Sequence, residues 1–301
     1  MSHFVGAVVV PASVSINIST NPSKYPDFYG ADAKEAKAGP ALADYLQQAL
    51  AKFDENIRVP RYVEYTKEAL IAKERAEVRA YAEGTYADYL RLGEAGYVEK
   101  FKGANQSHLH YLREEFPKRL EWTDEEHYAN GLRWSDEENI GPDGEVYSTY
   151  NPHSKWDWYV VGGRWEQVYR ERQGEPIAAL LASLKATKAA KANPSQVAEL
   201  KRAEAEVERV RNRVASGDAE YSQIHDALDK LYACEAYGTG HAPYSIVVPK
   251  EADWEWIERG QMGWWGMSSG DQDDDAWLDS VITVLEAQAE GSRLVYVDFH
   301  I

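Results

Sequence analysis

The sequence predicts an α+β fold, with a small mixed β-sheet that includes both terminal strands, helices that flank it and an inserted helical hairpin. Short apolar runs rich in β-branched residues lie near both ends of the 301-residue chain, with amphipathic helical segments between them. One internal stretch has almost no aromatic residues and carries a heptad-like apolar seam. Hydrophobic residues make up 44% of the chain and aromatic residues 12%, which is enough to build a core.

Three segments have the pattern of buried strands. Phe4 to Val10 is a β-branched run stopped by Pro11, whose ring removes a donor from the sheet. Tyr244 to Val248 ends in the same way at Pro249, and Arg293 to Ile301 closes the chain. The first and last strands are therefore expected in one sheet.

The segments between these strands read mainly as surface helices. Asn21 to Gly30 is rich in Pro, Tyr and Asn and predicts a loop. Apolar residues at helical spacing predict helices in the following ranges, the first broken near Gly39-Pro40 and the second near Gly84: Ala31 to Phe53, Thr66 to Leu92, Tyr97 to Leu120 and Ala276 to Ala289. Between Trp122 and Trp165, tryptophans alternate with acidic and Gly/Pro turns, and this pattern predicts short strands.

Pro176 to Leu231 predicts the helical hairpin. Its turn is expected at Asn193-Pro194-Ser195, with Ser195 as N-cap, and Ser216-Gly217-Asp218 is expected to end the second helix. A third helix would carry Tyr221, Ile224, Leu228 and Leu231, and the seam of the second consists of Leu200, Ala203, Val207, Val210 and Val214. The predicted domains are thus a discontinuous core, 1–172 with 236–301, and an insertion, 173–235. An internal packing arm, self-association through the hairpin and docking of a partner remain open.

Composition excludes several classes of protein. The chain has 33 Lys and Arg against 50 Asp and Glu, a net charge of -17, which argues against direct nucleic-acid binding. Its one cysteine, Cys234, rules out an internal disulfide and a cysteine-type zinc site, and favours a reducing cytoplasm. Phe4 to Ala12 is too short to span a bilayer and follows no basic segment, so neither a membrane anchor nor a signal peptide is expected.

Two tryptophan-rich segments, Asn151 to Trp165 and Trp254 to Met267, are the candidate ligand site. In the first, indoles near a cation could stack on a planar ligand, and adjacent glycines allow close approach of the backbone. If 156–161 is one strand, Trp156, Trp158 and Val160 share one face and Asp157, Tyr159 and Val161 the other. Candidates from both segments are Lys155, Trp156, Trp158, Tyr159, Gly162, Gly163, Arg164, Trp165, Trp264 and Trp265. The alternative is that these tryptophans fill the core.

The histidines are few and scattered. His3 begins the first strand and His300 ends the last, so the two become neighbours if these strands pair antiparallel, with Asp298 on the same face as His300. His3, Asp298 and His300 are therefore the candidate metal or acid–base residues, and local hydrogen bonding is the alternative. The acidic run that starts at Asp271 precedes a predicted helix, and its expected role is to cap that helix rather than to bind calcium.

Four ordered blocks carry a resemblance to a known family. They are Met1-Ser-His-Phe4, the block from Ser154 to Trp165, Met262-Gly-Trp-Trp-Gly-Met267 and Val297-Asp-Phe-His-Ile301. Together they resemble an uncharacterised family of proteins from bacteriophages and their bacterial hosts. This resemblance implies an accessory phage protein, made in the bacterial cytoplasm, of a kind often used against host defence.

The leading hypothesis is a non-enzymatic binding protein. It would sequester a nucleotide-like molecule, or block a host defence protein, through the tryptophan-rich site, with Arg164 and Lys155 meeting phosphates. One alternative is a hydrolase in which His3, Asp298 and His300 hold a divalent metal ion. The sequence itself requires no cofactor. Another is an acidic mimic of nucleic acid that binds a host protein.

Overall fold

The computed structural model describes residues 3–22, 34–101, 104–189, 194–218, 223–224, 227, 230–231, 241–263 and 268–301. The chain divides into two compact units: a sheet unit, Met1–Ile57 with Asn151–Ile301, and a helical unit, Arg58–Tyr150. This division differs from the predicted one, which placed 58–150 inside the core domain and made 173–235 a separate insertion. The physical reason is that the helical unit has an apolar cluster of its own around Tyr97, Leu109 and Leu112.

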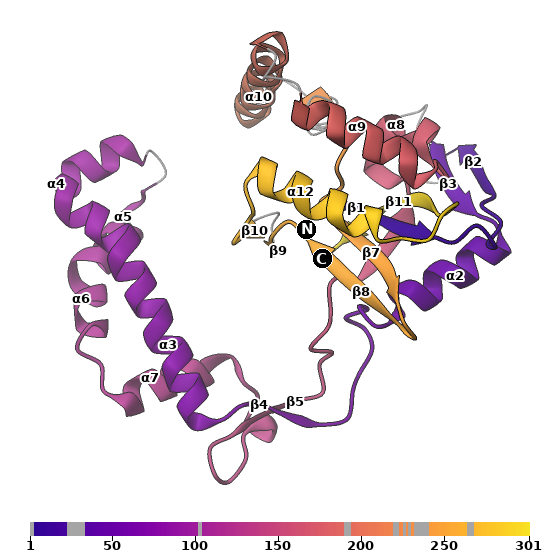
Figure 1. Ribbon diagram of the computed structural model, residues 1–301. Helices are drawn as coiled ribbons and strands as arrows, with labels where there is room; N and C mark the ends of the chain where they lie inside the picture. Colours follow the sequence, from indigo (N-terminus) through magenta and orange to yellow (C-terminus); the bar gives the residue numbers. More distant parts are fainter. Residues whose placement is uncertain are drawn as a thin grey trace. The chain divides into compact units, whose positions relative to one another are not determined.

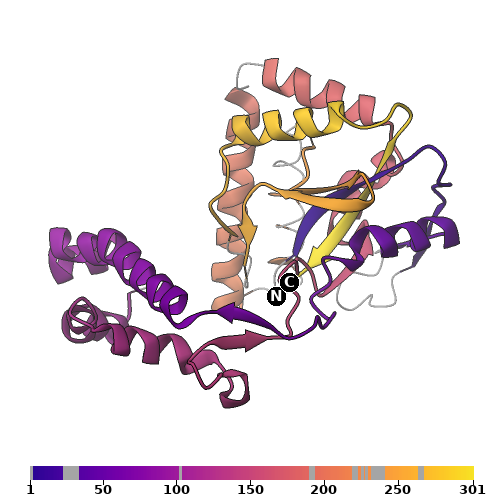
Figure 2. The same ribbon diagram turned by 60° about the horizontal axis from the view of Figure 1, so that its bottom comes forward.

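The sheet unit is built on a five-stranded mixed sheet of order β6-β11-β1-β7-β8. Its strands are β6 (Trp158–Val161), β11 (Arg293–His300), β1 (His3–Val10), β7 (Ser245–Lys250) and β8 (Asp253–Glu258). β1 pairs with β11 antiparallel, with His3 opposite His300, and with β7 in parallel. Figure 2 shows the two chain ends side by side, where these strands meet. The predicted α+β fold, with both terminal strands in one mixed sheet, is confirmed.

Helices cover both faces of this sheet. On one face, α9 (Ile177–Ala189) and α12 (Asp274–Glu286) pack against Val5, Ala7 and Val9 of β1. On the other, α2 (Pro40–Ala51) packs against Phe4, Val8 and Val10. Figure 1 shows α9 and α12 together on one side of the strands and α2 away from them. Because alternate residues of β1 enter different cores, the strand is apolar along its whole length.

The start of α12 confirms the predicted role of the acidic run. Asp273 is the N-cap, and its side chain accepts a hydrogen bond of 2.9 Å from the main-chain nitrogen of Ala276. Asp274 and Asp275 occupy the first turn, where the helix dipole favours negative charge. These three acids therefore serve the helix, whereas Asp271 accepts hydrogen bonds from the hydroxyl groups of Tyr244 and Ser268.

Two local predictions are wrong. Lys34–Ala38 is a strand, β3, paired with β2 (Ile18–Pro22), although the sequence predicted helix there and placed Asn21 in a loop. The Ala, Glu and Lys residues of β3 favour helix, but the hydrogen bonds between β3 and β2 outweigh this propensity. Of the predicted loop, 23–30 lies outside the described residues. Asp124–Gly131 is a helix, α7, instead of short strands, because Thr123 and Glu126 form a capping box.

The predicted hairpin is helical, but its two helices have different partners. α9 packs on the sheet core, where its residues Leu180 and Leu184 are buried beside α12. α10 (Pro194–Ala215) carries the seam, and Val207 and Val210 pack on Ala227 in the segment that follows. α10 begins at Pro194, so Ser195 lies inside it, and Gly217 follows its end with a φ of +81°. Tyr221 and Leu228 lie outside the described residues.

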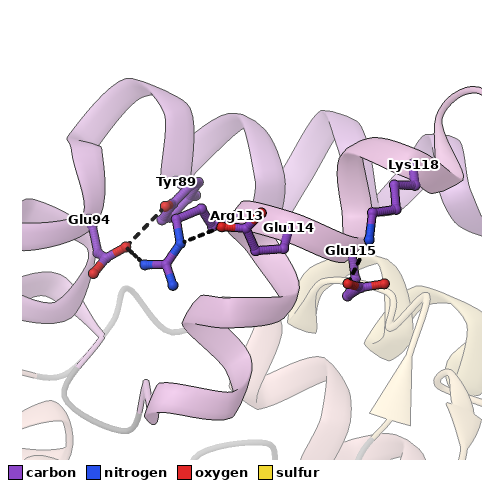
Figure 3. Close-up of polar contacts among 6 residues, drawn as sticks. All are labelled: Tyr89, Glu94, Arg113, Glu114, Glu115 and Lys118. Atoms are coloured by element: carbon purple, nitrogen blue, oxygen red, sulfur yellow. Dashed lines mark hydrogen bonds and ion pairs between the residues drawn. The ribbon is translucent and has the colours of Figure 1, made fainter.

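The helical unit contains the predicted helices around an aromatic cluster. The strands β4 (Tyr62–Tyr65) and β5 (Val146–Ser148) pair where the chain enters and leaves this unit. Its helical segments are α3 (Lys67–Tyr81), η1 (Ala82–Tyr86), α4 (Ala87–Lys100), α5 (Gln106–His110), η2 (Tyr111–Glu115), α6 (Phe116–Arg119) and α7. The interruption predicted near Gly84 is the π-helical turn η1. Figure 3 shows Arg113 of η2 reaching Glu94 of α4, which also accepts a hydrogen bond from Tyr89.

Candidate functional site

The ends of three strands bring together a cluster of polar and aromatic side chains, the terminal histidine cluster. It consists of His3, Asp157, Trp158, Asp298 and His300. The register of the sheet explains it, because His3 lies opposite His300 and His300 lies opposite Trp158. The predicted pairing of the two histidines, with Asp298 beside them, is therefore confirmed.

Each histidine of the cluster is bound by its own carboxylate. Nδ1 of His3 lies 2.9 Å from Oδ1 of Asp298, and Nδ1 of His300 lies 2.6 Å from Oδ1 of Asp157. The two imidazole rings are in edge contact, with centroids 4.8 Å apart, and the Trp158 indole stacks on His300 at 4.8 Å. The cluster thus contains two histidine–aspartate pairs in contact.

The two histidines and Asp298 are buried, whereas Asp157 and Trp158 are partly exposed to solvent. Both histidine side chains are only 5% exposed and Asp298 2%, whereas Asp157 is 27% exposed. Nε2 of His300 is buried and has no hydrogen-bond partner in the described part of the chain. No three His, Cys, Asp or Glu side chains among the described residues are arranged to hold a metal ion. Because each Nδ1 already has a different carboxylate, the geometry gives the predicted metal triad no support.

The paired glycines after β6 explain how the backbone fits against this cluster. Gly162 and Gly163 have φ angles of +75° and +55°, in the left-handed region. A Cβ atom built on Gly163 would lie less than 3.0 Å from three side-chain atoms of Asp298. The close approach expected of these glycines is thus an approach to Asp298.

A second candidate site, the aromatic groove, lies over the α2 face of the sheet. It has a volume of about 500 Å³ and is lined by Lys52, Phe53, Pro152, His153, Lys155, Lys250, Asp253, Trp254, Glu255 and Trp256. The two indoles alternate with acidic residues along β8, the edge strand. The Trp256 ring contacts Phe53 and Phe299, and the Trp254 ring contacts Tyr45. The groove therefore has an aromatic floor anchored in the core.

Lysines surround this floor, each with a carboxylate partner. Lys52 lies 2.5 Å from Asp253, and Lys250 lies 3.0 Å from Glu255, both in largely exposed pairs. The hydrogen bond from Lys52 holds the pKa of Asp253 below its usual value.

The third lysine, Lys155, lies 2.6 Å from Glu258, whose other carboxylate oxygen accepts a hydrogen bond from the Trp256 indole. Buried Asn151 shapes the loop before Lys155, since its amide donates to the main-chain oxygens of Lys52 and Asp54.

The structure separates the residues predicted from the first tryptophan-rich segment. Lys155 lies in the groove, beside Trp254 and Trp256 of the second segment. Trp158 belongs to the terminal histidine cluster, and Tyr159 faces the α2 side, where its ring contacts Trp156. Trp165 is buried beneath α9 and α12, so the core alternative holds for it. The Arg164 side chain, Trp264 and Trp265 lie outside the described residues.

The predicted faces of this segment are wrong at two positions. Trp156 is buried, donates its indole N–H to the main-chain oxygen of Leu50, and lies on the side of Tyr159 rather than of Trp158. Asp157 reaches His300 and so acts on the side of Trp158. The reason is that β6 begins only at Trp158, whereas Trp156 forms an isolated bridge with Asp54. Strand alternation therefore does not extend to 156 and 157.

Sequence reasoning missed Asp157 as a histidine partner and both Lys52 and Phe53 as groove residues. The sequence could have indicated Asp157, because it lies next to the candidate residue Trp158 in the same short block. Comparison of the chain with protein-family models, curated proteins and solved structures gives no match. In the part of the chain that the structure describes, no helix is both long and apolar enough to cross a membrane.

Proposed function

We propose that this protein binds a planar, anionic, nucleotide-like small molecule in the aromatic groove. The observation that carries the proposal is the convergence of indoles and lysines from three distant segments. Lys52 follows α2, Lys155 precedes β6, and Trp254 and Trp256 belong to β8. Aromatic surface with a few convergent charges is the usual composition of a small-molecule site.

The chemistry of the groove suits a base with an attached phosphate. Stacking of a base on an indole contributes about 1–3 kcal/mol. Lys52 and Lys250 are paired with exposed carboxylates, and such pairs stabilise a protein by only about 0–1 kcal/mol. A phosphate can therefore replace a carboxylate partner at little cost. The carboxylates in turn keep the groove from being strongly positive. Such a groove fits a single small anion better than a polyanion.

The biological role we propose is sequestration of such a ligand as a phage counter-defence protein. Its support is the resemblance of four sequence blocks to proteins of bacteriophages and their hosts. Blocking a host defence protein remains the alternative role, and it would not require the groove to take a nucleotide. The two roles are distinguished by whether the purified protein binds nucleotides on its own.

Calorimetry with adenosine and guanosine mono- and triphosphates tests the proposal. We expect binding by the native protein and a loss of affinity of about 10- to 150-fold in Lys155→Gln, since one charge-assisted contact contributes about 1.5–3 kcal/mol. Lys185→Gln is the matched control, because Lys185 forms a pair of the same length, 2.6 Å, with Glu286 away from the groove. Absence of nucleotide binding, or equal affinities for both variants, would contradict the proposal.

Trp256→Leu tests the aromatic floor separately. Trp158→Leu is its control, since Trp158 is a partly exposed indole on the opposite face of the sheet. Only Trp256→Leu should weaken nucleotide binding, and circular dichroism of both variants checks that they fold.

A further inference from the structure

Lys155 and Glu258 form the least exposed of the three ion pairs around the aromatic groove. Their side chains are 31% and 18% exposed, whereas each of the other two pairs has a partner that is 62% exposed. Water competes less for hydrogen bonds at a shielded site, so polar groups there discriminate more strongly between ligands. This pair is therefore the part of the groove best suited to select a ligand by its hydrogen bonds.

The carboxylate of Glu258 is held in one orientation and keeps two acceptor positions. Oε1 accepts a hydrogen bond of 2.6 Å from Lys155, and Oε2 accepts one of 2.9 Å from the indole N–H of Trp256. A carboxylate has about four lone-pair positions, two on each oxygen. Within the described part of the chain, one position on each oxygen is thus left, and this arrangement receives two parallel donors.

A lysine beside such a carboxylate presents one donor next to two acceptors. Guanine has the complementary edge, because its acceptor O6 is followed by the donors N1–H and the 2-amino group. Adenine has the acceptor N1 in the central position, and so does cytosine with N3. Uracil has N1-side and N3-side carbonyl acceptors on either side of its single donor. Of the common bases, guanine alone satisfies all three positions of the pair.

We propose that the aromatic groove selects guanine nucleotides. Lys155 donates to O6 of the base, and Glu258 accepts from N1–H and from the 2-amino group. The base stacks on the aromatic floor, and its phosphates bind Lys52 and Lys250, whose carboxylate pairs are exposed and easily replaced. This inference rests on the proposed function, because it names the base that the groove takes.

The order of residues along β8 supports this orientation of the ligand. Glu258 ends the strand, whereas Asp253 begins it and lies opposite Lys250 in the hairpin with β7. Lys52 pairs with Asp253, so Lys52 and Lys250 both lie at the end of β8 away from Glu258. The six residues of β8 span about 17 Å, which suits a nucleoside with a chain of phosphates.

Calorimetry with the triphosphates of guanosine, inosine and adenosine tests this selection on the native protein. Guanosine triphosphate should bind about 10- to 150-fold more tightly than adenosine triphosphate, since adenine leaves the buried side of the carboxylate without donors. Inosine keeps O6 and N1–H but lacks the 2-amino group. Inosine triphosphate should therefore bind with an affinity between those of the other two.

Glu258→Gln tests the residue that reads the base. One half of the new amide is a donor, so the preference for guanosine over adenosine triphosphate should fall to within about threefold. Glu286→Gln is the matched control, because Glu286 also lies 2.6 Å from a lysine but belongs to α12, away from the groove. The control should keep the native preference. Circular dichroism checks that both variants fold, and if Glu258→Gln does not, the three nucleotides still decide on the native protein.

The outcomes separate this inference from the proposed function. Equal affinities for the three nucleotides would overturn guanine selection and leave the groove as a nucleotide site. Absence of binding by all three would overturn both proposals. A guanine preference that persists in folded Glu258→Gln would also overturn the inference, because another group would then read the base.

Discussion

The substitution Gly163→Ala tests how closely the terminal histidine cluster is packed. Gly163 has a φ of +55°, and its main chain lies directly against the Asp298 side chain. Alanine adds one methyl group at a position with neither a suitable backbone angle nor free space. The change should therefore destabilise the fold and separate Asp298 from His3.

The magnitude follows from two contributions. An L-residue in the left-handed region costs about 1–2 kcal/mol relative to glycine. The added methyl would lie less than 3.0 Å from the β-carbon, the carboxyl carbon and one carboxylate oxygen of Asp298. Overpacking of a buried site typically costs about 1–3 kcal/mol more. We therefore expect the free energy of unfolding to fall by about 2–5 kcal/mol.

The assay is urea unfolding followed by tryptophan fluorescence, with Gly270→Ala as control. Gly270 belongs to the same unit and has a φ of +66°, but no heavy atom lies within 4 Å of its Cβ position. The control therefore measures the backbone cost alone. The difference between the two variants isolates the contact with Asp298. Equal stability of the two variants would refute the close packing described here.

The remaining predictions concern other parts of the molecule. Burial, followed by the charge of Arg172, lowers the pKa of His241 to about 4, so the folded state binds fewer protons than the unfolded state between pH 6.5 and 4. Stability should fall as the pH is lowered through that range, by about 2 kcal/mol for this partly exposed ring, and urea titrations of His241→Asn should show a smaller fall. Asn151→Ala should destabilise the protein by about 2–4 kcal/mol in the same assay, because it leaves two main-chain carbonyls without their donor. Glu94→Gln should leave the urea midpoint unchanged, since its pair with Arg113 is exposed to solvent, and a clear shift would contradict this.

The parts predicted correctly from sequence are those with strong local signals. β1 and β7 are short apolar runs that end at or near a proline, and β11 repeats the pattern at the end of the chain. The pairing of His3 with His300 followed from assuming that the terminal strands are antiparallel neighbours. Capping of α12 by Asp273 followed from the position of acids before a helical pattern.

The errors arose where a distant partner decides the local structure. Lys34–Ala38 is a strand because β2 pairs with it, and its composition alone favours helix. The seam of α10 contains a true apolar face, but the periodicity does not name its partner, which is the segment with Ala227 rather than α9. Similarly, Trp156 and Asp157 change sides because Asp54, about a hundred residues earlier, forms a bridge at Trp156.

The sequence by itself determined the fold class, the terminal strands and the histidines that meet at their ends. These features depend on apolar periodicity and strand register, which are properties of neighbouring residues. Only the tertiary structure decided that each histidine has its own aspartate, that Gly163 lies against Asp298, and that Lys155 joins Trp254 and Trp256 in one groove. Such contacts depend on distances across the folded sheet between segments far apart in the chain, which local patterns do not encode.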